Sequence, residues 1–249
     1  MELSVVVPVR NEAENLASLL DEISQALDGR YEFEIVYVDD GSTDDTLPCL
    51  IALRRSFPRL RILRHPQGCG QSTALLTGIR AAHGETIATL DGDGQNDPAD
   101  IPRLLEALWE LREKNPLAMV TGHRKRRKDA GWRKLTSLVA NAVRGSLLVD
   151  NTPDTGCGLK VFPRELFLLL PYFDHMHRFM PALVQRAGGE TISVEVNHRP
   201  RLHGESKYGT WHRLRVGIVD IIGVMWLQRR AKVAEVEELD FIGNRQLTQ

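Results

Sequence analysis

Cysteine is scarce in this chain of 249 residues. Cys49, Cys69 and Cys157 are scattered, odd in number and without the C-x-x-C spacing of a zinc or redox site. An excess of basic residues is missing as well, since 32 Lys and Arg stand against 33 Asp and Glu, for a net charge of -1. We therefore expect the free thiols of a cytosolic protein, and the charge balance argues against a nucleic-acid binder.

Long hydrophobic runs are also lacking. The longest candidate, residues 216–228, is interrupted by Asp220 and falls short of the roughly 20 apolar residues of a membrane span. The apolar run at the N-terminus is too short for a secretory signal, and no basic segment precedes it. We expect neither secretion nor a membrane-spanning helix. The length and the 42% hydrophobic content instead predict one main domain with a sizeable core.

The first hundred residues alternate β-branched runs with helix-like segments. We predict strands at 3–9, 33–40, 60–65 and 85–91, and helices at 12–27, 43–57 and 71–84. Continuous apolar strands are typical of a parallel sheet that is covered on both faces by helices. The sequence therefore predicts an α/β fold with a mostly parallel sheet.

The second part of the chain is less regular. We predict a helix at 100–114, a strand at 117–123, a basic loop at 124–134, a helix at 135–148, a strand at 158–162, helices from 164 and at 178–187, a strand at 190–199 and a last helix at about 210–230. A polar tail follows.

Polar clusters stand where three of the predicted strands end: "PVRNE" after the first, "DDGSTDD" after the second and "DGDGQND" after the fourth. In open α/β sheets, ligands bind outside the carboxyl ends of the strands. We therefore expect one site to use all three clusters. Within the second cluster, the carboxylates of Asp39 and Asp40 are expected to accept hydrogen bonds from a ribose or a base edge. Ser42 to Asp45 are expected to cap the next helix.

The third cluster offers hard oxygen ligands in Asp91, Asp93 and Gln95, which suit Mg²⁺ or Mn²⁺. A calcium-binding EF-hand loop is excluded, because its Gly and Glu positions hold Asn96 and Pro102 here. A solvated turn is the remaining alternative. Asp97 and Asp100 are expected to start the following helix, where its dipole favours negative charge.

The motifs "VVVPVRNEAENL", "VDDGSTDDT" and "ATLDGDGQNDP", in this order and separation, resemble the family 2 glycosyltransferases of the GT-A (Rossmann-like) fold. The closer similarity is to the dolichol-phosphate mannose synthase group, whose metal motif reads D-x-D-x-Q. Later, "RLHGESKYG" is similar to that group's R-x-x-G-x-S-K signature. The resemblance covers about residues 3–215.

The resemblance implies a role for each matching position. The nucleotide-sugar-binding positions are Pro8, Arg10, Glu12, Asp39, Asp40 and Asp91. Asp93 and Gln95 match the ligands of a Mg²⁺ or Mn²⁺ ion on the diphosphate, and Arg124 and Arg133 fall near arginines that neutralise phosphates. Arg201, Ser206 and Lys207 match the segment that receives the lipid phosphate. The implied catalytic set is Asp93, Arg124, Arg133, Arg201 and Lys207.

The implied reaction is an inverting, metal-dependent transfer of a sugar from a nucleotide-diphosphate sugar to a polyprenyl or dolichyl phosphate. Mannose from GDP-mannose is the leading guess, with UDP-glucose and UDP-linked uronic acids as other donors. The stretch "NDPAD" departs from the relatives, which often have a His and a Pro pair there, so the sugar stays open. We expect a catalytic domain at residues 1–208, with an amphipathic helix and a polar tail at 209–249.

The last helix has two interpretations. It is either a terminal core helix or an interfacial helix, with Trp211 and Trp226 near its ends and arginines on both sides. The interfacial interpretation predicts a peripheral enzyme on the cytoplasmic face of the membrane, with the membrane surface and a membrane protein as candidate partners. The basic run at 124–134 is either a solvated face or a loop that clamps phosphates and lies on an anionic leaflet.

Three other functions stay open. The first is a glycosyltransferase with a hydroxyl acceptor and Asp154 as its base; a processive synthase is disfavoured, because the Q-x-x-R-W motif is absent. The second is a sugar-phosphate nucleotidyltransferase, which normally has a glycine-rich loop where this chain has "PVRNEAEN". The third is a non-catalytic nucleotide-sugar-binding or scaffold protein, although no predicted metal ligand is lost.

Overall fold

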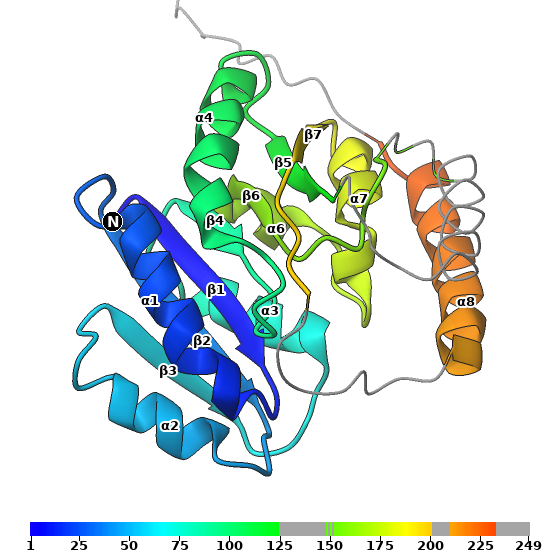
Figure 1. The fold of residues 1–249 in the computed structure, drawn as a ribbon. Helices are drawn as coiled ribbons and strands as arrows, with labels where there is room; N and C mark the ends of the chain where they lie inside the picture. Colours follow the sequence, from blue (N-terminus) through cyan, green and yellow to red (C-terminus); the bar gives the residue numbers. More distant parts are fainter. Residues whose placement is uncertain (125–147, 149, 151, 201–209, 233–249) are drawn as a thin grey trace, which may run out of the picture.

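The computed structural model describes residues 1–124, 148, 150, 152–200 and 210–232 (Figure 1). Its centre is a seven-stranded sheet with the order β3-β2-β1-β4-β6-β5-β7. The strands are β1 (Leu3–Val9), β2 (Phe33–Asp40), β3 (Leu60–His65), β4 (Thr86–Thr89), β5 (Ala118–His123), β6 (Lys160–Pro163) and β7 (Glu190–Glu195). Among the described strands, only β6 runs against its neighbours β4 and β5, and the other strand pairs are parallel. The mostly parallel sheet is therefore confirmed.

The helices agree with the sequence pattern, with shorter bounds at several ends. They are α1 (Leu16–Leu27), α2 (Thr46–Leu53), α3 (Gln71–Ala81), α4 (Ile101–Arg112), α6 (Arg164–Leu169), α7 (Met180–Arg186) and α8 (Thr210–Arg229). Short 3-10 turns occupy Ala13–Asn15, Pro98–Asp100 and Met176–Arg178. The helix predicted at 135–148 lies outside the described residues except at its last position.

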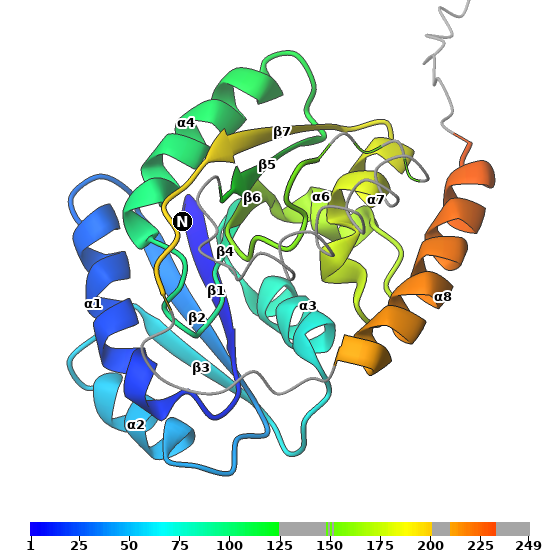
Figure 2. The ribbon, with the colours of Figure 1, turned by 45° about the vertical axis from the view of Figure 1, so that its right-hand side comes forward.

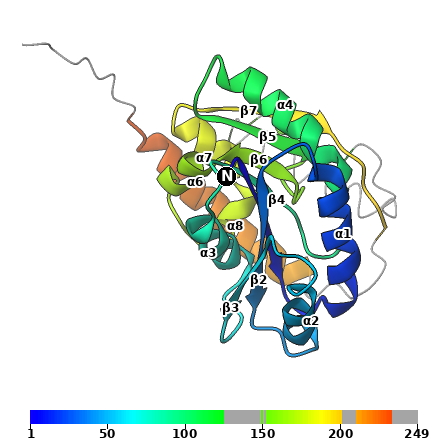
Figure 3. The same cartoon turned by 90° about the vertical axis from the view of Figure 1, so that its left-hand side faces the viewer.

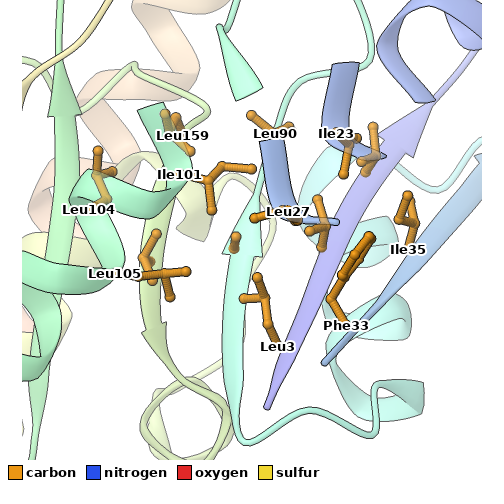
Figure 4. Close-up of a cluster of buried hydrophobic side chains, with 14 of the residues drawn as sticks. Leu3, Ile23, Leu27, Phe33, Ile35, Leu90, Ile101, Leu104, Leu105 and Leu159 are labelled. Carbon is orange, nitrogen blue, oxygen red and sulfur yellow. The ribbon is translucent and has the colours of Figure 1, made fainter. Parts of the chain in front are cut away.

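Helices cover both faces of the sheet, as the edge-on view in Figure 3 shows. On one face, α1 and α4 pack over the side chains of alternate strand positions, among them Leu3, Phe33 and Ile35 (Figure 4). On the other face, α3, α6 and α7 pack against the complementary positions, such as Val6 and Val36. Because the central strands are buried on both faces, their sequences are mostly apolar.

The helices are held by apolar stripes. In α1, five buried side chains recur at helical spacing: Leu16, Leu19, Leu20, Ile23 and Leu27. This spacing puts them on one face of the helix, toward the sheet. Full burial of one leucine is worth about 1.5–3 kcal/mol, so such a stripe fixes the helix and the loops at its ends.

Helix α8 lies beside α7, at the edge of the molecule (Figures 1 and 2). Val224 is buried in the core, whereas Ile218, Val219 and Ile222 are exposed. Apolar side chains therefore lie on both faces of its described turns, which differs from the predicted amphipathic pattern. Within the part of the chain that the structure describes, no helix is long and apolar enough to span a bilayer.

Candidate functional site

The loops after β1, β2 and β4 meet at one edge of the sheet. This follows from the strand order, in which β1 lies between β2 and β4 and all three point the same way. Gly92, just after β4, lies so close to the end of β1 that an added Cβ would stand 2.5 Å from Val9 and 3.1 Å from the carbonyl oxygen of Pro8. The three polar clusters of the sequence thus form a single region, as expected.

The loops after β1 and β2 are tied together by Asn11. Its backbone is left-handed, with φ at 54°. The Asn11 N–H donates to Ser42 Oγ at 2.9 Å, and its side-chain oxygen accepts from the Thr43 N–H at 2.8 Å. The next N–H, that of Glu12, donates to Thr46 Oγ1 at 2.9 Å. A strained residue held by this many bonds fixes the loop that carries Arg10 and Glu12.

These bonds revise the predicted capping of α2. Thr46 donates its N–H to Asp44 at 3.0 Å, so Asp44 does cap the helix start. Ser42 and Thr43 instead bond with Asn11 in the neighbouring loop, and Asp45 makes no side-chain cap bond.

Asp39 and Asp40 lie in different surroundings although they are adjacent. Asp39 is completely buried and accepts the Ser42 N–H at 3.0 Å. Asp40 accepts the N–H groups of Cys69 and Gly70, at 2.8 and 2.9 Å, and bonds with His65 Nδ1 at 2.8 Å. Burial opposes its charge, but these bonds outweigh burial and lower the pKa of Asp40. Asp40 therefore stays ionised and fixes the glycine loop before α3.

Asp91 follows β4, the middle strand of the sheet, and therefore lies near the centre of the edge formed by the carboxyl ends of the strands. Its side chain accepts a hydrogen bond from Gln71 Nε2 at 2.8 Å, and its N–H donates to Asn96. Burial and the charge of Asp93 raise the pKa of Asp91, while Lys160 and Arg124 act in the opposite direction. A carboxyl group whose charge is opposed in this way favours an incoming cation or hydrogen-bond donor.

Asp93 and Gln95 follow in a tight turn. Gly94 has a φ of 70°, and the Gln95 N–H donates to Asp93 Oδ1 at 3.1 Å. Together with Asp91 they present carboxylate and amide oxygens, which is the donor chemistry that Mg²⁺ and Mn²⁺ prefer. The residues present therefore fit a divalent cation, although metal binding itself stays a prediction.

Asp97 and Asp100 start the next helix, as the sequence predicts. Asp97 accepts the Ala99 N–H at 3.1 Å, at the beginning of the 3-10 turn that leads into α4. Asp100 accepts the Asn197 N–H at 2.7 Å and pairs with Arg103. Within residues 91–100, Asp91, Asp93 and Gln95 therefore belong to the candidate site, whereas Asp97 and Asp100 have structural roles.

Arg124 and Asp154 form a buried ion pair. The guanidinium donates from Nε to Asp154 Oδ2 at 2.6 Å and from Nη2 to Oδ1 at 2.8 Å, with both side chains about nine-tenths buried. Burial opposes the arginine charge, yet the bonds and the charge of Asp154 raise the pKa of Arg124. The predicted phosphate-binding arginine is therefore held by this carboxylate.

The predicted acceptor residues Arg201, Ser206 and Lys207, and also Arg133, lie outside the described residues. The chain that leads to them is described up to Pro200. There the Arg199 N–H donates to the carbonyl oxygen of Gln95 at 3.0 Å, although 104 residues separate them. Arg199 also bonds with Asp97 and Glu22, both at 2.6 Å. The approach to the acceptor motif is thus fastened to the predicted metal motif.

A comparison with protein families decides the class. The model of the family described as "Glycosyl transferase family 2" matches residues 4–170, which is more than half of the chain. The chain belongs to glycosyl transferase family 2. It is a glycosyltransferase, as the sequence predicts.

Curated relatives of this family 2 glycosyltransferase cover most of the chain. A dodecaprenyl-phosphate galacturonate synthase of Rhizobium johnstonii is 37% identical over 92% of this chain and 68% of its own length. An undecaprenyl-phosphate 4-deoxy-4-formamido-L-arabinose transferase of Aeromonas hydrophila is 31% identical over 90% of this chain and 67% of its own length. The chain therefore spans about two thirds of the length of these relatives.

Solved structures support the GT-A fold. Glucosyl-3-phosphoglycerate synthase of Mycobacterium tuberculosis, in complex with UDP, matches 97% of this chain and 84% of its own, with a TM-score of 0.66 and 20% identity. A complex of the same enzyme with Mn²⁺, UDP-glucose and glycerol 3-phosphate gives 0.65. At this identity the likeness establishes the fold alone.

Sequence reasoning missed three residues of this glycosyltransferase site. Gln71 touches Asp91 from α3, and the backbone of Gly158 lies against the Asp91 carboxylate, where a Cβ would stand 2.3 Å from Oδ2. Lys160 is buried in β6, and burial lowers its pKa. A lysine inside an apolar strand was the only signal in the sequence, because these interactions with Asp91 join residues that lie 20 to 69 positions apart.

Proposed function

We propose that this family 2 glycosyltransferase moves a sugar from a nucleotide-diphosphate sugar to a polyprenyl phosphate. The observation that carries the proposal is the junction of Arg199 with Gln95, which brings the approach to the acceptor motif against the donor and metal motif. A transfer enzyme needs its two substrates side by side. The names of the two relatives, which both refer to polyprenyl phosphates, support this acceptor class.

The proposed mechanism assigns the donor to the edge formed by the loops after β1, β2 and β4. Pro8, Arg10, Glu12, Asp39 and Asp40 form or support the nucleoside site, and Asp91 faces the nucleotide. Mg²⁺ or Mn²⁺ held by Asp93 and Gln95 would supply Lewis-acid stabilisation of the departing diphosphate. Arg124 and Arg133 add positive charge where negative charge develops. Direct displacement predicts inversion at the anomeric carbon.

The acceptor chemistry explains why no base is assigned. A phosphate monoester is ionised at neutral pH, so it needs positioning more than proton removal. Arg201, Ser206 and Lys207 are proposed to supply that positioning. A hydroxyl acceptor would require a base, and Asp154 fits that role poorly because both of its oxygens accept hydrogen bonds from Arg124.

The donor sugar is the least constrained part of the proposal. Mannose stays the prediction from the sequence, whereas the two relatives are named for galacturonate and 4-deoxy-4-formamido-L-arabinose. The experiment therefore uses a panel of labelled GDP-mannose, UDP-glucose and UDP-galacturonate with undecaprenyl phosphate and Mn²⁺ or Mg²⁺. Label in the organic phase is expected from at least one donor. Label from none of them, with active control enzymes, would contradict the proposal.

The roles within the site are tested separately. Asp93→Ala should abolish metal-dependent binding of the donor, since it removes a metal ligand. Arg201→Ala should leave donor binding intact and raise the KM for the lipid acceptor. If Arg201→Ala instead weakened nucleotide binding alone, the proposed division between donor and acceptor residues would be wrong.

We further propose that residues 1–208 are the catalytic domain and that the 209–249 region contacts the cytoplasmic face of the membrane. The exposed face of α8 carries Ile218, Val219, Ile222 and Trp226, with exposed Arg229 and Arg230 at its end. One face of α8 packs on the protein. Because the other face is apolar too, contact with the membrane interface, which removes that face from water, is favourable. The lipid acceptor is consistent with this location, and a membrane protein partner stays a candidate.

Liposome flotation tests the membrane contact. The protein should float with anionic liposomes at low salt and less at high salt, because the arginines contribute electrostatic attraction. Ile222→Asp should reduce flotation, whereas Glu110→Gln, at an exposed position of α4, should not. A wild-type protein that never floats would identify α8 as a terminal core helix.

A further inference from the structure

The first turn of α3 is fixed on several sides. The Gly70 N–H is bound by Asp40, and the Ala74 N–H donates to the Gly70 carbonyl at 3.0 Å. Ser72 is buried and bonds with His177 at 2.8 Å, while Thr73 bonds with Tyr172 at 2.8 Å. The residue between Gly70 and Ser72, which is Gln71, therefore has a defined backbone position.

The side chain of Gln71 reaches out of this fixed turn to the centre of the site. Gln71 is exposed, and its amide donates to Asp91 Oδ1 at 2.8 Å. The whole Asp91 carboxylate lies against the backbone of Gly158, where an added Cβ would stand 2.3 Å from Oδ2 and 2.6 Å from Oδ1. Asp91 is thus confined between an amide that binds it and a backbone that blocks it.

A carboxylate at the end of a strand has several side-chain rotamers, and only some of them face a ligand on the edge of the sheet. A hydrogen bond to a charged group is among the stronger contacts available to select one of these rotamers. We propose that Gln71 is a positioning residue, which holds Asp91 in the orientation that receives the nucleotide of the donor. This inference rests on the proposed function.

A double-mutant cycle on nucleotide affinity tests the proposal. The affinities of the full chain for UDP and for GDP, each with Mn²⁺, are measured by calorimetry. Gln71→Ala should lower the affinity for whichever of the two nucleotides binds by about ten-fold, which is the scale of one hydrogen bond to a charged group. Adding Gln71→Ala to Asp91→Ala should weaken it little further, because the group that Gln71 acts upon is gone.

The cycle separates positioning from direct contact. If Gln71 touched the nucleotide itself, its removal would cost the same ten-fold in the Asp91→Ala background, and that result would overturn the proposal. Equal affinity of wild type and Gln71→Ala would overturn it as well. If wild type bound neither nucleotide, the proposed function would fail together with this inference, which is a distinct outcome.

Gly158→Ala approaches the same carboxylate from the other side. The new Cβ would stand 2.3 Å from Asp91 Oδ2, so the end of the Asp91 side chain has to move while the net charge stays the same. We expect weaker nucleotide binding with an unchanged melting temperature, and little further effect in the Asp91→Ala background. Gly223→Ala is the matched control, because its added Cβ would meet nothing within 4 Å. Unchanged affinity in Gly158→Ala would contradict the importance of the Asp91 orientation.

Discussion

Two carboxylates, Glu34 and Asp91, lie at opposite ends of the strands of the sheet, and they differ in the groups that surround their charge. Glu34 lies near the beginning of β2, where it is buried with its side chain 4% exposed. It accepts hydrogen bonds from Ser4 Oγ and the His83 N–H, both at 2.6 Å, and from Arg61 at 2.8 Å. Asp91 follows the carboxyl end of β4. Its neighbours are Gln71 and a second carboxylate, that of Asp93.

The pKa values of the two groups move in opposite directions. Burial opposes the charge of Glu34, but its hydrogen bonds outweigh burial and lower its pKa. For Asp91, burial and the charge of Asp93 raise the pKa, and the nearby cations do not cancel them. The charge of Glu34 therefore stabilises the fold, whereas the charge of Asp91 opposes folding. A charge that folding opposes is typical of a functional residue.

The largest expected effect is that of Asp91→Asn on donor binding. Nucleotide affinity in the presence of Mn²⁺ should fall by about 100-fold, since a charged contact to the donor and its cation is lost. The melting temperature should stay unchanged or rise, because the substitution removes a charge that folding opposes. Calorimetry on the same samples measures both quantities.

Asp21→Asn, at an exposed position of α1, is the control with the same loss of charge. It should change neither affinity nor melting temperature. A large drop in the melting temperature of Asp91→Asn would place Asp91 in the same structural class as Glu34.

The sequence alone predicts the part of the site that is local in the chain. The motifs after β1, β2 and β4 are each contiguous, and the alternation of strands and helices places them at one edge through the parallel arrangement. The capping role of Asp97 and the strand at 117–123 are predictable for the same reason. Each depends on neighbours only a few residues away.

The rest depends on contacts that no local pattern contains. The pairing of Arg124 with Asp154 joins residues 30 apart, and the approach of Gly158 to Asp91 joins residues 67 apart. The antiparallel direction of β6 results from the chain returning between β4 and β5, which the apolar run at 158–162 does not reveal. Side-chain partners of this kind require the tertiary fold.

The buried pair Arg124 and Asp154 sharpens the comparison, since it lies at the functional edge but each of its charges has a buried partner of opposite sign. Asp154→Asn should lower the free energy of unfolding by about 3 kcal/mol or more, because a buried guanidinium loses its charge partner. Asp28→Asn is the control, since its partner Arg59 forms an exposed pair worth about 0–1 kcal/mol. Urea unfolding measures both. Equal effects of the two substitutions would contradict the structural role of the buried pair.

Glu34→Gln should lower the free energy of unfolding by about 1–3 kcal/mol at pH 7, because it replaces the charged acceptor of two hydrogen bonds and one ion pair by a neutral amide. The folded pKa of Glu34 lies below its unfolded value of about 4.3, so its contribution is present above that value and is lost as the pH falls through the folded pKa. The difference from wild type should therefore shrink in acid. Glu110→Gln, at an exposed position of α4, is the control for the loss of one negative charge, and nucleotide affinity should stay unchanged in both variants.

The smallest expected effect separates backbone strain from side-chain bonding in the loop that carries Arg10 and Glu12. Asn11→Gly retains a residue that tolerates the left-handed backbone, whereas Asn11→Ala does not, and both variants lose the side-chain bonds to Thr43. The alanine variant should be less stable than the glycine variant by about 1 kcal/mol, the cost of a left-handed residue that has a Cβ. Nucleotide affinity should fall further in the alanine variant, since only there does the backbone before Glu12 have to change. If both variants bound the nucleotide equally and differed only in stability, the strain at Asn11 would belong to the fold, like the charge of Glu34, and not to the site.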